Sequence, residues 1–129
     1  MASAGSAESF FARARSMAAE GLFEYAIDLY LDGLKLDPDN VTAHQALREA
    51  GLQRKSAGGQ DLAMLQKVKL RKPAGDPVGD LLNTEKLLAY DPGNLEWLAA
   101  AVRHAKAANL PNTWQWLHGV YSAASKSKT

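Results

Sequence analysis

The chain has 129 residues, and its 15 Lys and Arg nearly balance its 14 Asp and Glu, so the formal charge at pH 7 is +1. A chain of this length can bury one core, and a charge this small excludes nonspecific capture of nucleic acid or anionic lipid by a global field. The absence of cysteine excludes disulfides, thiolate metal sites and cysteine nucleophiles.

Apolar residues at spacings of three and four predict helices along most of the chain. In chain order we expect them at about 7–20, 23–36, 41–55, 76–90, 95–108 and 111–124. Gly21 provides the break after the first helix, since glycine reaches backbone angles that other residues resist. Asp76 followed by Pro77 is a typical helix start, and residues 109–111 form a tight turn. The sequence therefore predicts an all-α chain.

Two short strings repeat: residues 36–40 are LDPDN and residues 90–94 are YDPGN. In each string the proline cannot continue the preceding helix. Asn40 or Asn94 can then cap the next helix by accepting backbone N–H bonds. A helix, an Asp-Pro-x-Asn turn and a second helix are therefore the recurring unit.

The stretch 56–75 interrupts this regularity, because only a few residues should join two neighbouring helices. It carries apolar residues among several cations, so we expect a short amphipathic helix followed by a turn. Lys67, Lys69, Arg71 and Lys72 form a basic patch within it. The patch is either a solvated loop or a contact for nucleic acid or another anionic surface, although no interleaved aromatic residues provide base-stacking platforms.

Together these residues resemble the tetratricopeptide-repeat family, whose unit is about 34 residues of two antiparallel helices with small residues at their contact. In the first unit the matching positions are Ala14, Gly21, Ala26, Tyr30, Gly33 and Pro38. The second unit departs from the family at Thr84, where an aromatic residue is usual, and the third at Trp114, where a small one is. A generic helical bundle with chance Asp-Pro turns is the alternative.

The resemblance implies one domain with a right-handed α-α superhelix of three degenerate repeats. Their expected bounds are 6–40, then 41–94 with an insertion at about 56–75, then 95–125, followed by a tail at 126–129. In this family the first helix of each repeat lines a concave groove that holds a peptide or a protein surface. The groove positions here would be Glu8, Phe11, Arg15, Gln45, Glu49, Gln53, Glu96, Arg103 and Lys106.

Large aromatic residues crowd the last predicted helix, namely Trp114, Trp116 and Tyr121. Repeat arrays normally end in a capping helix with a polar outer face, and none follows here. We therefore expect this edge to support a homodimer or to dock on another protein. The alternative is that the tryptophans pack inward or against the insertion.

No catalytic, cofactor or metal site is predicted. His44, His104 and His118 never fall at the spacing that places two ligands on one helical turn, and we expect them to be surface or half-buried structural histidines. Gly58-Gly59 lacks the rest of a phosphate-binding loop.

The sequence thus predicts a non-catalytic protein-interaction scaffold. The alternative is a module that binds nucleic acid or an anionic surface through its basic insertion, although nucleic acid is the less favoured partner. Residues 1–8 lack the basic start and apolar run of a secretory signal, and no apolar run approaches the roughly 20 residues of a membrane span. We therefore expect a cytoplasmic protein.

Overall fold

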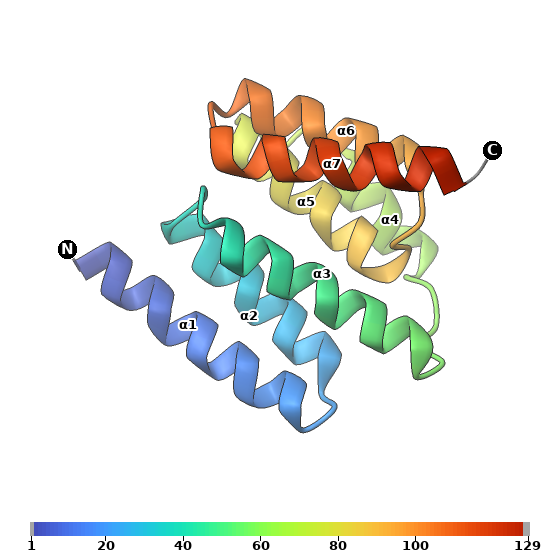
Figure 1. The fold of residues 1–129 in the computed structure, drawn as a ribbon. Helices are drawn as coiled ribbons and strands as arrows, with labels where there is room; N and C mark the ends of the chain where they lie inside the picture. Colours follow the sequence, from blue (N-terminus) through green and yellow to red (C-terminus); the bar gives the residue numbers. More distant parts are fainter. Residues whose placement is uncertain (1, 128–129) are drawn as a thin grey trace.

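The computed structural model describes residues 2–127, with side chains from residue 6 onward, and over that range it contains seven helices and no strand (Figure 1). They are α1 (Ala2–Ala19), α2 (Phe23–Leu36), α3 (Val41–Ser56), α4 (Met64–Arg71), α5 (Pro77–Tyr90), α6 (Leu95–Ala107) and α7 (Pro111–Ser127). The all-α prediction is confirmed, and so is a short helix in the insertion. None of these helices is both long and apolar enough to cross a bilayer.

Two helices extend beyond the bounds that the sequence predicts. Helix α1 begins at Ala2 rather than near residue 7, and α7 continues to Ser127, into the residues expected to be a frayed tail. Residues 128 and 129 of that tail lie outside the described part of the chain.

The two Asp-Pro-x-Asn turns have the same hydrogen bonds, as the repeated sequence predicts. Asn40 Oδ1 accepts the backbone N–H of Ala43 at 3.0 Å, and Asn94 Oδ1 accepts that of Trp97 at 3.0 Å. Each asparagine also donates its side-chain N–H to the aspartate at the start of its turn, at 3.0 Å and 3.2 Å respectively. A side-chain acceptor at this position satisfies one of the free N–H groups of a helix start.

The helices form two layers (Figure 1). Helices α1, α3 and α7 run in the same direction on one side, and α2, α5 and α6 lie behind them. The contacts agree, since α2 packs on α1, α3 and α5, and α5 packs on α3 and α6. Helices α6 and α7 pack on each other, and α7 also packs on α3. Helix α4 packs mainly on α5, and Arg71 near its end lies over the Trp97 ring of α6.

A long-range cap fixes the position of α7. Asp39, in the turn before α3, accepts hydrogen bonds from the backbone N–H and the hydroxyl of Thr113 at 2.9 and 2.8 Å. Its second oxygen accepts from the backbone and side-chain N–H groups of Asn112 at 3.3 and 3.0 Å. A carboxylate is favourable at this position because the free N–H groups of a helix start carry partial positive charge. Gly93, the equivalent residue of the second turn, has no side chain to do this.

The core has two parts. One joins α1, α2, α3 and part of α5, and its fully buried members include Ala14, Ala26, Ile27 and Leu34. The other joins α5, α6 and α7, and its fully buried members include Leu81, Leu98, Ala101 and Ala105. Burying the apolar stripes of each helix against the next pair is the main stabilising contribution.

Arg54, near the end of α3, links residues 57–63 to α2 and to the end of α5. Its guanidinium donates to Glu24 on α2 at 3.1 Å and to the backbone carbonyl of Gln60 at 2.6 Å, and it lies 4.1 Å from the centre of the Tyr90 ring. Since Arg54 is buried, these contacts compensate for removing its charge from water. They fix the direction in which the insertion leaves α3.

Helices α3 and α5 approach most closely at Gly51, which gives a stability prediction. A Cβ atom at this position would lie 2.7 Å from the carbonyl oxygen and 2.9 Å from the Cα of Ala89. Because backbone cannot rotate away as a side chain can, Gly51→Ala should lower the free energy of unfolding by about 1–3 kcal/mol. Gly119→Ala, at a helical position where nothing lies within 4 Å, should instead raise it by about 0.5–1 kcal/mol. Urea denaturation of both variants checks this; equal effects would mean the helix contact is wrong.

The cap by Asp39 gives a second prediction. Asp39→Ala removes an acceptor that serves four donors, so the free energy of unfolding should fall by about 1–3 kcal/mol. Asp32→Ala is the matched control, since that residue makes only an exposed pair with Lys35 and should change little. Thermal unfolding followed by circular dichroism measures both. A wild-type melting temperature for Asp39→Ala would rule out the cap as the anchor of α7.

Candidate functional site

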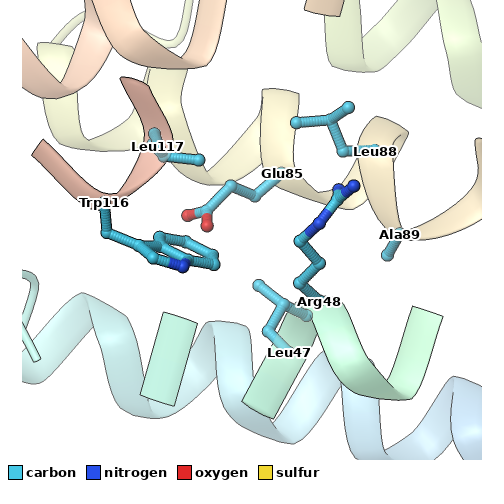
Figure 2. A pocket seen from close by; sticks show the side chains of 7 residues that line it. All are labelled: Leu47, Arg48, Glu85, Leu88, Ala89, Trp116 and Leu117. Carbon is cyan, nitrogen blue, oxygen red and sulfur yellow. The ribbon is translucent and has the colours of Figure 1, made fainter. Parts of the chain in front are cut away.

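A small pocket opens between α3, α5 and α7 (Figure 2). Its walls are Leu47, Arg48, Glu85, Leu88, Ala89, Trp116 and Leu117. The cavity holds about 10 Å³, which is close to the minimum for one water molecule. The Trp116 ring and the Glu85 carboxylate face each other across it, and Arg48 rises from α3 on the opposite side.

Behind this pocket, His44 and Glu85 form a buried pair. His44 on α3 is 0 % exposed and Glu85 on α5 is 5 % exposed. The Nδ1 atom of His44 lies 2.7 Å from Glu85 Oε2, and its Nε2 atom lies 2.7 Å from the carbonyl oxygen of Pro38. The histidine therefore links α3 to α5 and to the turn that precedes α3.

The hydrogen-bond geometry also indicates which nitrogen atoms of His44 carry hydrogen. A carbonyl oxygen can only accept, so Nε2 of His44 carries a hydrogen, and Nδ1 faces a carboxylate. Burial by itself lowers the pKa of His44. The charge and hydrogen bond of Glu85, the Pro38 carbonyl and the charge of Asp39 together outweigh burial and raise that pKa above its ordinary value of 6.5. The raised pKa favours a hydrogen on Nδ1 as well, which then donates to Glu85 Oε2.

Two polar groups at the pocket have unfilled hydrogen-bonding capacity. The second carboxylate oxygen of Glu85, Oε1, is buried and has no hydrogen-bond partner among the described residues. Arg48 is half-buried, which lowers the pKa of its guanidinium, and within residues 6–127 no acidic side chain pairs with it. A buried acceptor without a donor costs free energy, so a group that supplied one would bind favourably there.

Of the predicted groove residues on α1 and α3, all but one are exposed. Glu8 and Arg15 form an exposed ion pair at 2.8 Å. Glu49 and Gln53 line an open hollow beside Phe23, and Gln45 is exposed on the same helix. Phe11 is the exception, because it is 3 % exposed and packs in the core 6.4 Å from the Tyr30 ring. Its assignment to the groove is therefore wrong.

The predicted groove residues on α6 are exposed but lie in the other layer. Glu96, Arg103 and Lys106 belong to α6, which packs on α5 and α7 and lies in the layer of α2 and α5 rather than in that of α3. The structure therefore does not place them with those of α1 and α3. It is α7 that extends the layer of α1 and α3.

The aromatic residues of α7 are half-buried. The Trp116 ring lies 6.5 Å from that of His44, and Lys106 lies 4.8 Å from the centre of the Trp114 ring. Trp114, Trp116 and Tyr121 all pack partly against the second core cluster. A homodimer through this edge stays a prediction.

In the basic patch, Lys67 is turned inward and bonds to Asp61 at 2.5 Å, and Arg71 lies 5.8 Å from the centre of the Trp97 ring. Lys69 and Lys72 are exposed and make no ion pair with any residue in the range 6–127. Two of the four cations thus have contacts within the chain, and binding of a partner through the patch stays a prediction.

Sequence reasoning missed the pocket and its ionic pair. His44 was expected to be at the surface or half-buried, and that expectation is wrong. The available signal was a histidine and an arginine at positions 44 and 48, one helical turn apart and next to Leu47 of the apolar stripe. Glu85 falls on the apolar stripe of its own helix, between Leu82 and Leu88, which marks it as buried. Its pairing with His44 could not be found from spacing, because the two helices meet only in the folded chain.

Comparisons of the chain with protein-family models, curated proteins and solved structures give no match. The resemblance to tetratricopeptide repeats therefore depends on the residues of the chain and stays a prediction. Within the described range, no three His, Asp or Glu side chains come close enough together to hold a metal ion.

The His44–Glu85 pair predicts that stability falls as pH rises. Because the folded-state pKa of His44 lies above the unfolded value of 6.5, its contribution is complete below about pH 6.5 and is lost as pH passes the folded pKa. Urea denaturation across that range should show wild type losing its advantage over His44→Gln, by about 1.4 kcal/mol for each unit of pKa shift. A pH-independent difference between the two proteins would contradict the charged pair.

Proposed function

We propose that the protein is a non-catalytic scaffold that binds a peptide or a protein surface on the layer formed by α1, α3 and α7. The observation that carries this proposal is the pocket at Glu85 and Arg48, where a buried acceptor and a half-buried guanidinium lack partners. A side-chain carboxamide contains both a donor for Glu85 Oε1 and an acceptor for Arg48. Trp116 and Leu47 supply apolar walls for the methylene groups beside it.

The surface around the pocket supports the same proposal. Gln45 and Glu49 are exposed on α3, on the helix that carries Arg48, and they offer donors and acceptors to an extended chain. Large partly buried aromatic residues such as Trp116 are typical anchors of protein interfaces. The cavity is too small for a whole side chain, so Trp116 must turn outward as the partner enters.

Selection of a displayed random-peptide library on the purified protein tests this function. Enriched peptides should bind at micromolar affinity and alter tryptophan fluorescence. Arg48→Met should weaken their binding about tenfold to a hundredfold, as expected for the loss of a hydrogen bond to a charged group. Arg103→Met, an exposed arginine replaced on α6, is the matched control and should bind as wild type does.

Two outcomes contradict the proposal. If no peptide is enriched above background, the scaffold function is wrong. If Arg103→Met abolishes binding and Arg48→Met does not, the binding surface lies on α6, as the original groove assignment has it, and the pocket plays no part.

A further inference from the structure

The outward side of α4 combines the most exposed apolar side chains of this helix with free cations. Met64 is 68 % exposed, Leu65 is 77 % exposed and Val68 is 43 % exposed. Lys69 lies four residues after Leu65, one helical turn along the same side. Lys72 directly follows the last residue of α4, where it is exposed and also borders a hollow between α4, α5 and α6. We call these five residues the α4 outer face.

The inward side of α4 explains why the outer face is exposed. Lys67 bonds to Asp61, and Leu70 is half-buried where α4 meets α5. These two contacts orient the helix, and none of its own residues is fully buried. The outer face therefore has no role in holding α4 to the rest of the fold.

We propose that the α4 outer face docks the protein on an anionic lipid bilayer. Such a bilayer can bind both the apolar side chains and the cations of the face. The apolar side chains enter the headgroup boundary while the lysines approach the negative lipid surface. This surface is separate from the pocket between α3, α5 and α7, so the proposal is independent of the scaffold function.

The chemistry of the face favours a bilayer over other anionic partners. Nucleic acid would use Lys69 and Lys72 but would gain nothing from Met64 and Leu65, and no exposed aromatic residue on α4 offers a stacking surface. A stable protein interface needs roughly 800 Å² on each partner. Three apolar side chains on two turns of helix supply only a fraction of that area. A bilayer needs no matching shape, so a small face is sufficient for weak reversible docking.

A unique fluorescent label provides the direct test. The chain has no cysteine, so Leu65→Cys accepts an environment-sensitive dye at one position only. Emission should shift to the blue with vesicles of phosphatidylcholine and phosphatidylserine at low salt, and the shift should disappear at high salt. Vesicles of phosphatidylcholine alone should give no shift. The absence of any shift with the anionic vesicles at low salt would overturn the proposal.

Unlabelled variants separate the two components of docking. In co-sedimentation with the same anionic vesicles, Lys69→Gln with Lys72→Gln should weaken partitioning about twenty-five-fold, at about fivefold for each cation. Leu65→Gln should weaken it as well. The matched controls are Arg13→Gln on α1 and Leu52→Gln on α3, both exposed positions on other helices, and they should partition as wild type does.

Three further results would overturn the proposal. One is wild-type partitioning of Leu65→Gln, since apolar insertion would then contribute nothing. The others are tighter binding to polyuridylate or to polyglutamate than to the vesicles. These would identify nucleic acid or an acidic protein as the partner of Lys69 and Lys72.

Discussion

The polar contacts that connect α3, α5 and α7 converge on the four-residue turn before α3. The carbonyl of Pro38 accepts a hydrogen from His44, which in turn donates to Glu85 on α5. The carboxylate of Asp39 caps α7. One turn thus ties α3 to α5 and α7 through polar contacts whose partners lie far apart in the chain. Apolar burial stabilises the layers, but it is not directional, so these contacts determine where α7 lies.

The local structure could be predicted from the sequence because its causes are local. Asn40 and Asn94 cap the helices that immediately follow them, and Asp76 accepts the backbone N–H of Gly79 at the start of α5. Spacings of three and four located every large helix, and the cation-rich segment in the insertion was correctly expected to be helical. These features depend on residues within one or two turns of each other, which a single sequence displays directly.

The pairing of helices could not be predicted in the same way. A strict succession of repeats places α6 beside α3, whereas the structure places α7 there. The one sequence difference between the two turns is Asp39 in place of Gly93, and its significance appears only when Thr113 is found beside it. Likewise, Phe11 has the spacing of a groove residue, but it fills the space left by Gly33 on α2. Burial depends on what the neighbouring helix leaves open, and spacing along one helix does not show that.

The small formal charge does not show that some charged side chains are paired within the chain and others are not. Several carboxylates are engaged by other groups of the chain: Asp39 at the start of α7, the buried Glu85 with His44, and the exposed Asp61 with Lys67. Each of these acids has an internal donor or cation for at least one oxygen, although Oε1 of Glu85 has none, and each contributes little to the outer field. Lys69 and Lys72 on α4 have no such partner among the described residues. The α4 outer face is therefore locally positive and partly apolar although the chain is nearly neutral. A partner would respond to that face rather than to the net charge.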